Sequence, residues 1–92
     1  MISRSGYPTD ELIEQLRTME DSDGVLRLAA EAVNATGYGS AWEEDDMLKV
    51  ATRGWSGCED IVVALNANVF AMVRWESSHR GGLHVFKLGG TP

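Results

Sequence analysis

Apolar residues recur at helical spacing near the start of the chain. Leu12, Leu16 and Met19 follow the i, i+4, i+7 spacing of one helix face. Thr9 stands just before this stripe and is suited to cap the helix, because a threonine hydroxyl accepts a hydrogen bond from a backbone N–H of the first turn. The polar link of residues 20–24 ends the pattern, so we expect a short amphipathic helix before it.

A second apolar stripe follows the link. Val25, Ala29 and Val33 again lie four residues apart, and Gly37 is placed to end the helix in the left-handed conformation. Two short helices joined by a tight link pack as an antiparallel pair. The pattern therefore predicts a helical hairpin over residues 9–37.

The middle of the chain changes from helical to strand spacing. Residues 38–46 combine small residues with four consecutive acids, and we expect them to form a loop. Residues 47–53 predict a strand with Leu48 and Val50 on one face.

The stretch GWSGCED, residues 54–60, lies between that strand and an apolar run. Ser56 and Glu59 have the S-x-x-E spacing of a capping box, in which each side chain bonds a backbone N–H of the first helical turn. The glycines let the chain turn sharply on either side of the tryptophan. We therefore expect a helix from residue 56 to about residue 66, and a structural role for the stretch rather than a catalytic one.

The last part of the chain has an apolar spacing of two residues. Residues 69–77 and 83–88 predict two strands joined by a glycine-containing hairpin. Two registers stay open, in which Trp75 lies opposite His84 or opposite Leu88. Both registers place the same four side chains on the core face: Trp75, His84, Phe86 and Leu88.

The order of these elements predicts an α+β fold. The 92 residues are enough for one domain, residues 1–92, with one modest core. We expect a two-helix hairpin followed by a β-α-β-β unit over residues 47–88. The small antiparallel sheet of about three strands is packed by the helices. Residues 1–8 carry no periodicity and are predicted to be a flexible tail.

Charge is distributed unevenly along the chain. The net charge is −6, with 24% charged residues, which is an ordinary content for a globular protein. Residues 1–46 contain eleven acids and three arginines, a net charge of −8, whereas residues 47–92 contain three acids and five bases, a net charge of +2. A strongly acidic half is therefore joined to a mildly basic one.

The acidic half offers a candidate binding surface. A rigid array of carboxylates can occupy a basic groove built for phosphate groups, and opposite charge steers such a partner from a distance. Trp42, next to the acidic run, supplies an aromatic anchor that charges alone lack. The candidate partner-binding residues are Glu43, Glu44, Asp45, Asp46, Asp21, Asp23, Glu11, Glu14 and Trp42.

The basic residues of the second half leave an alternative open. Arg74, Arg80 and Lys87 could contact phosphate groups while tryptophans stack under bases, as in small nucleic-acid-binding modules. The acids of the first half oppose this alternative, because they repel phosphate.

No catalytic or metal site is expected. GWSGC departs from the G-x-S-x-G nucleophile elbow, because Cys58 stands where the last glycine should be. A pairing of Cys58 with His79 or His84 would lack an orienting acid, and the spacings match no zinc motif. We expect no cofactor and no enzymatic activity. The single cysteine, together with the lack of a signal-like or membrane-spanning apolar segment, predicts a cytoplasmic protein.

Residues 51–88 resemble the C-terminal half of short, uncharacterised proteins encoded by bacteriophages and prophages. Those proteins typically show a G-W-S-G-x-E-x-I segment, a tryptophan strand and an S-x-x-R-G-G hairpin. The first 46 residues match no family. The matching residues are Gly54, Trp55, Ser56, Gly57, Glu59, Ile61, Trp75, Ser77, Arg80, Gly81 and Gly82.

The resemblance implies a phage accessory protein, a setting that includes small acidic inhibitors of host defence such as anti-CRISPR proteins. We therefore predict a non-enzymatic interaction protein that binds and blocks a host protein with a basic groove. A small nucleic-acid-binding module is the alternative. Exposed apolar surface on the short sheet also leaves a homodimer open.

Overall fold

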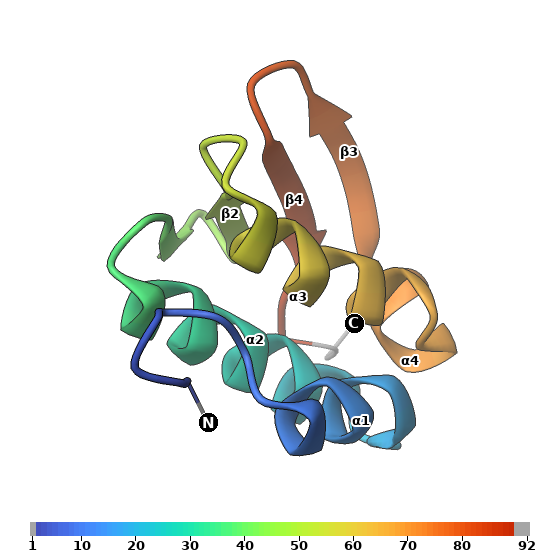
Figure 1. Cartoon of the computed structure of the whole chain (residues 1–92). Coiled ribbons are helices and arrows are strands. Elements are labelled where there is room, and N and C mark those ends of the chain that lie inside the picture. The colour runs from blue at the N-terminus through green and yellow to red at the C-terminus, as the bar shows by residue number, and fades with distance from the viewer. Residues whose placement is uncertain (1, 90–92) are drawn as a thin grey trace.

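The computed structural model describes residues 2–89, which form one sheet with helices on one of its faces (Figure 1). The class predicted from the sequence, α+β with an antiparallel sheet packed against helices, is confirmed. The elements in chain order are α1 (Asp10–Thr18), α2 (Ser22–Thr36), β1 (Ser40–Glu44), β2 (Met47–Ala51), α3 (Ser56–Asn66), α4 (Val69–Met72), β3 (Trp75–His79) and β4 (Leu83–Lys87).

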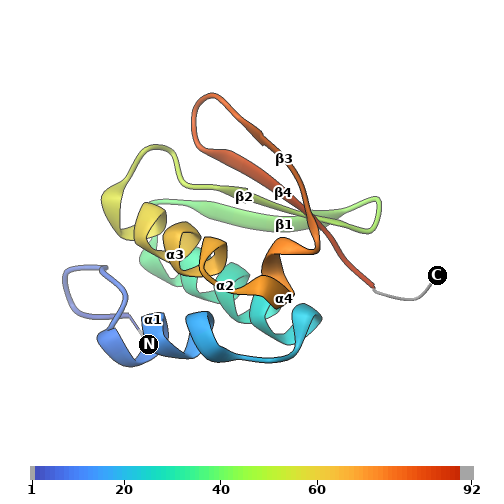
Figure 2. The same cartoon turned by 90° about the vertical axis from the view of Figure 1, so that its right-hand side faces the viewer.

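The sheet has four antiparallel strands in the order β1-β2-β4-β3. Helices α2 and α3 lie between the sheet and α1, and the other face of the sheet carries no helix (Figure 2). As predicted, Leu48 and Val50 of β2 face the helices, and both are buried with Phe86 of β4. The helices contribute Leu16, Leu26, Ile61 and Leu65 to the same core.

Helix α1 runs parallel to α3 and is joined to it at both ends. The Tyr7 and Ser56 hydroxyls are 2.7 Å apart at the N-terminal ends. The Asn68 side-chain amide donates to the carbonyls of Leu16 and Met19 at the C-terminal ends. The N-terminal residues 2–8 are closed by a bridge between Ile2 and Pro8.

Two of the predicted helix boundaries are confirmed. The Thr9 hydroxyl accepts from the backbone N–H of Leu12 at 3.3 Å, as an N-cap should. Gly37 ends α2 with φ at 78°, the left-handed conformation that glycine adopts without strain.

The expected loop of residues 38–46 is wrong, because its residues 40–44 form strand β1. Ser40, Trp42 and Glu44 lie opposite Ala51, Lys49 and Met47 in a regular ladder with β2. The outer edge of β1 is also paired: the Asn34 side chain accepts from the Ala41 N–H at 2.8 Å and donates to the Ala41 carbonyl at 3.0 Å. Because the strand carries few apolar residues, its sequence lacks the usual alternation.

The strand expected over residues 69–77 is wrong for its first half, which forms helix α4. The Asn68 side chain accepts from the N–H groups of Phe70 and Ala71 and so caps a single helical turn. Val69 and Val73 are exposed, so their apolar side chains do not follow the face of a sheet. The strand begins only at Trp75.

Both predicted hairpin registers are also wrong, because Trp75 lies opposite Phe86 and the ladder shifts between Trp75 and Ser77. The shift is a bulge, which moves the following residues by one position. Phe86 and Leu88 are buried and His84 is half-buried, but Trp75 is 46% exposed and does not belong to the core.

The capping box predicted at Ser56 and Glu59 is absent. Trp55 occupies the N-cap position and makes no side-chain cap. Ser56 is the first helical residue and bonds Tyr7, whereas Glu59 accepts from the hydroxyl of Thr52 at 3.1 Å. Both side chains therefore tie α3 to other segments instead of closing its first turn.

Candidate functional site

The four consecutive acids lie on the hairpin between β1 and β2. Glu43 and Glu44 are the last residues of β1, and Asp45 and Asp46 form the two-residue turn. Both turn residues have positive φ, 53° and 63°, as a type I′ turn requires. Such turns favour Asn-Gly and Asp-Gly, so Asp45 suits the first turn position, whereas Asp46 stands at the second position, where glycine is preferred.

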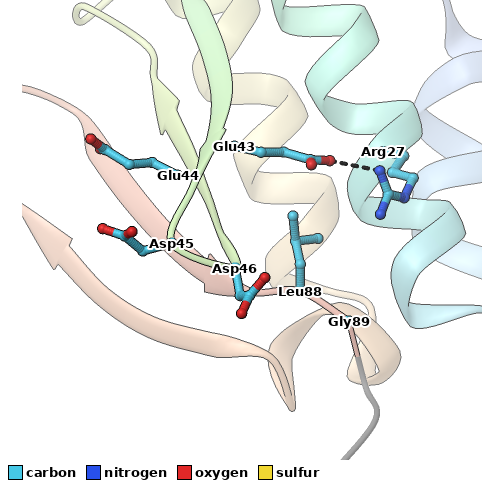
Figure 3. A pocket seen from close by; sticks show the side chains of 7 residues that line it. All are labelled: Arg27, Glu43, Glu44, Asp45, Asp46, Leu88 and Gly89. Carbon is cyan, nitrogen blue, oxygen red and sulfur yellow. Dashed lines mark hydrogen bonds and ion pairs between the residues drawn. The ribbon is translucent and has the colours of Figure 1, made fainter.

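Glu43 and Glu44 point to opposite faces of the sheet, as neighbouring residues of a strand must. Glu43 points toward α2, where its carboxylate is 2.6 Å from the Arg27 guanidinium (Figure 3). Glu44 points away from α2 and is 2.7 Å from the Lys49 ammonium. Hydrogen bonding and attraction from Lys49, with a further hydrogen bond from the Trp42 side chain, hold the pKa of Glu44 below its usual value of 4.5.

Asp45 and Asp46 have no neutralising neighbour among the described residues. Both are exposed, and within residues 2–89 neither side chain makes a hydrogen bond or an ion pair. Both line a shallow pocket of about 300 Å³ together with Arg27, Leu88 and Gly89 (Figure 3). Since Glu43 and Glu44 each have a basic partner, the unneutralised charge of the hairpin resides on the two turn residues.

Trp42 lies on the same face of β1 as Glu44, on the side of the sheet that carries no helix. Its side chain is 42% exposed although it is the largest on the strand. Val85 of β4 lies on the same face and is buried, yet it is not part of the core cluster beneath the helices. We call Trp42, Glu44, Asp45 and Asp46 the hairpin tip.

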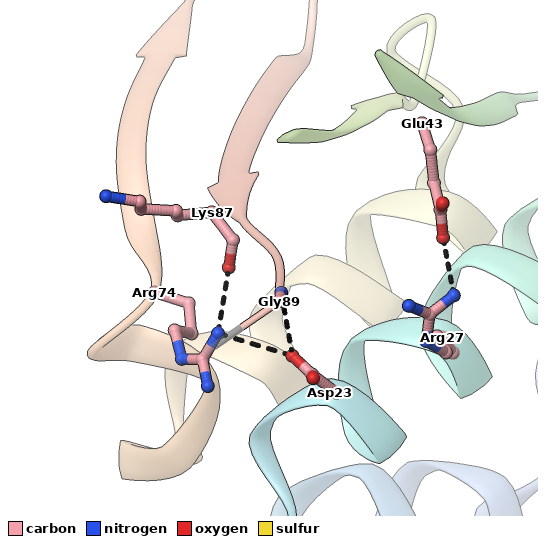
Figure 4. A network of polar contacts seen from close by, with 6 residues as sticks. All are labelled: Asp23, Arg27, Glu43, Arg74, Lys87 and Gly89. Carbon is pink, nitrogen blue, oxygen red and sulfur yellow. Dashed lines mark hydrogen bonds and ion pairs between the residues drawn. The ribbon is translucent and has the colours of Figure 1, made fainter. Parts of the chain in front are cut away.

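Asp23 and Asp21 lie at the start of α2. The Asp23 carboxylate accepts from Arg74 at 3.2 Å and from the Gly89 N–H at 3.3 Å (Figure 4). The neighbouring Leu88 N–H donates to the Asp46 carbonyl at 2.8 Å, so the end of β4 connects Asp23 to the hairpin. Asp23 is neutralised by Arg74, whereas Asp21 is exposed and makes no cap bond.

Glu11 and Glu14 lie on α1, which packs beneath the other helices on the far side from the sheet (Figure 2). The Glu14 carboxylate is 3.7 Å from Arg17 of the same helix. The structure therefore divides the predicted acidic residues into a hairpin group, a group at the start of α2 and a separate pair on α1.

The three bases of the nucleic-acid alternative do not gather on one surface. Arg74 is engaged by Asp23 and by the Lys87 carbonyl at 3.4 Å (Figure 4). Arg80 lies in the turn between β3 and β4, and Lys87 ends β4 five residues beyond that turn. At about 3.3 Å per residue, these two side chains start roughly 15 Å apart or more.

Cys58 and the two histidines do not form a reactive site. The Cys58 side chain is fully buried, with its Sγ 3.4 Å from the Thr36 hydroxyl. His79 and His84 instead bond the hydroxyls of Ser77 and Ser78, each at 2.9 Å. Among residues 2–89, no group of three or more histidine, cysteine, aspartate or glutamate side chains is placed to hold a metal ion.

The stretch GWSG packs against neighbouring segments instead of forming the predicted capping box. The Trp55 ring lies over Gly57, where any side chain would overlap it, and stacks on Tyr38 with ring centres 4.3 Å apart. The Thr52 hydroxyl joins this turn to the distant hairpin by bonding Glu59 and the Gly82 carbonyl. Thr52 therefore holds the first turn of α3 against the hairpin between β3 and β4.

No family model, curated protein or solved structure matches this chain. No helix in the described part of the chain is long and apolar enough to span a bilayer.

Proposed function

We propose that this protein is a non-enzymatic interaction protein whose hairpin tip binds a basic groove on a partner protein and blocks it. The observation that carries the proposal is the pair of unneutralised carboxylates, Asp45 and Asp46, in a type I′ turn. Asp46 costs stability in a turn position that prefers glycine, and we infer that it is kept for the charge that it presents beside Asp45.

The hairpin tip combines the two features that a protein interface needs. Exposed charges at a projecting turn attract a basic partner and speed its approach, so they strengthen binding mainly through the association rate. Trp42 supplies apolar area on the adjoining strand, and a tryptophan buried at an interface is the residue type that most often dominates binding. Charge therefore steers the partner, and the tryptophan anchors it.

The expected class of partner follows from the resemblance of residues 51–88 to phage and prophage proteins. A small acidic phage protein that fills a basic groove would compete with nucleic acid for a host protein, as an anti-CRISPR inhibitor or another inhibitor of host defence does. We propose a bacterial nucleic-acid-binding protein as the target class.

The test is affinity capture from a bacterial lysate with three immobilised proteins: the wild type, the Trp42→Ala variant and the Asp45→Asn/Asp46→Gly variant. Proteins retained by the wild type and lost by both variants are identified by mass spectrometry, purified and titrated calorimetrically. Trp42→Ala should weaken binding about 30-fold or more, and removal of the turn charges roughly tenfold.

The matched control is Glu11→Gln/Glu14→Gln, which removes the same number of charges from α1. This variant should bind as the wild type does. A partner that is retained equally by the wild type and the hairpin variants, or is lost only with the α1 variant, would contradict the proposal.

The nucleic-acid alternative makes a separate prediction. If the hairpin between β3 and β4 bound phosphate groups, labelled single-stranded or duplex DNA or RNA would be retarded at low salt, and Arg80→Ala would abolish the effect. Because Arg74 is neutralised and Arg80 and Lys87 lie apart, we expect no retardation by the wild type.

A further inference from the structure

A groove of about 460 Å³ lies between α1 and α3. Its apolar residues are Pro8 and Ile13 on the α1 side, and Val63 and Ala64 of α3 with the C-cap residue Ala67 on the other side. Val63 is 64% exposed, so a large part of this side chain meets water rather than the core. Ala64 is buried at the floor of the groove, so the exposed apolar surface of the groove is small and comes from Val63, Ala67 and the half-buried Ile13.

The two ends of the groove carry opposite charges. Because α1 and α3 run parallel, Asp10 and Asp60 lie toward the N-terminal end of the groove and Arg17 toward its C-terminal end. Arg17 is also 3.7 Å from Glu14, but both side chains are exposed and such a surface pair is weak, so a second copy's carboxylates can compete for the arginine. Asp10 and Arg17 are seven residues apart, a distance of about 10 Å along a helix. The centre of this span falls at Ile13 and Val63, which are both apolar.

We infer that this groove is an interface with a second copy of the chain. Two copies that meet groove to groove with their helices antiparallel place the acidic end of each against Arg17 of the other. The apolar residues at the centre then lie against their own counterparts. A patch that is complementary to itself in this way is what a two-fold symmetric dimer requires.

The charges also select between the two ways of joining the grooves. With the helices parallel, the two acidic ends would face each other and the two arginines would do the same, which is repulsive. Only the antiparallel arrangement pairs each acidic end with a base. The sequence left a homodimer through the sheet open; the groove accounts better for a second copy because its charges complement one another. The inference does not rest on the proposed function.

The first test is the mass of the full-length protein in solution, measured by sedimentation equilibrium from micromolar to millimolar concentration. The wild type should approach twice the 10.0 kDa of the chain. Val63→Asp places an unpaired carboxylate at the centre of the interface and should weaken association on the order of 100-fold. The matched control is Val73→Asp, at a valine that is 68% exposed and outside the groove, which should associate as the wild type does.

The second test exchanges the charges. Arg17→Glu and Asp10→Lys/Asp60→Lys should each be monomeric alone, because like charges then face each other at both ends. An equal mixture of the two should form a heterodimer, in which both ends are again oppositely charged. Circular dichroism and thermal unfolding of each variant show that it is folded.

Three results would overturn the inference. One is a wild type that stays at the monomer mass at millimolar concentration. Another is a failure of the valine variants to differ, either because the Val63→Asp variant dimerises as the wild type does or because the Val73→Asp control also dissociates. The third is a mixture of the charge variants that remains monomeric while the wild type dimerises. Each readout is a mass, so its failure is distinct from a failure of partner binding at the hairpin tip.

Discussion

The turn at Asp45 and Asp46 yields a prediction that needs no partner. We expect the Asp45→Asn/Asp46→Gly variant to be more stable than the wild type. A left-handed conformation costs an ordinary L-residue roughly 1–2 kcal/mol, and glycine avoids this cost. Glycine also loses more backbone entropy on folding, which offsets about 0.5–1 kcal/mol of the gain. Relief of repulsion between neighbouring carboxylates adds a small further gain.

The net gain is therefore about 1 kcal/mol, which raises the melting temperature of a domain of this size by roughly 4–8 °C. Thermal unfolding followed by circular dichroism measures it. Two single variants separate the causes: Asp46→Ala removes the charge but keeps a side chain in the left-handed conformation, and Asp45→Asn removes only a charge. If Asp46→Ala stabilises as much as the double variant, or if the double variant melts no higher than the wild type, the reasoning from backbone strain is refuted.

Three further predictions concern the scaffold and the hairpin. Gly57→Ala should destabilise the fold by about 1–3 kcal/mol because its methyl group overlaps the Trp55 ring. Gly24→Ala meets only the far ends of the Asp21 and Met19 side chains, which can move aside, and should stabilise α2 by up to about 1 kcal/mol. Chemical denaturation measures both changes, and changes of the same sign would contradict the account. Thr52→Val should cost about 1–3 kcal/mol by leaving the bonds to Glu59 and Gly82 unmade, and an unchanged denaturation midpoint would argue against this role.

The third concerns Glu44, whose pKa is lowered mainly by Lys49. The charged form of Glu44 stabilises the folded state when the pH is above 4.5, the usual pKa of the group. This contribution is lost as the pH falls through the lower pKa that Glu44 has in the folded state. In Lys49→Met the pKa should rise toward 4.5, as followed by NMR titration of the carboxyl carbon; no rise would show that Lys49 is not the cause.

The helical parts of the fold could be predicted because their signals are local. The apolar stripe and the capping residue of α1 lie within a few positions of each other, and Gly37 marks the end of α2 through its own backbone conformation. Strand β2 was predictable for the same reason, because Leu48 and Val50 lie two residues apart on either side of Lys49.

The elements that were missed depend on distant residues. Strand β1 is supported on its outer edge by the side chain of Asn34, and α4 is begun by Asn68, which also bonds the end of α1. Likewise, Ser56 and Glu59 have capping spacing, but Tyr7 and Thr52 engage them in the folded chain.

The candidate site was predictable in composition and not in arrangement. The sequence identified Trp42 and the four acids that follow, but it contained no sign that Glu43 and Glu44 would point to opposite faces. The basic partners Arg27 and Lys49 come from α2 and β2, so the sequence could not separate neutralised acids from free ones. Only the folded structure shows that, of the four consecutive acids, Asp45 and Asp46 are the two without a basic partner among the described residues.

The most direct measurement is the affinity of the captured partner for the wild type and for the Asp45→Asn/Asp46→Gly variant, at low and at physiological salt. The account predicts that the variant, although more stable, binds roughly tenfold more weakly at low salt, with a smaller loss at higher salt where charges are screened. A variant that binds as tightly as the wild type at both salt concentrations would contradict the claim that the charges of the turn contact the partner.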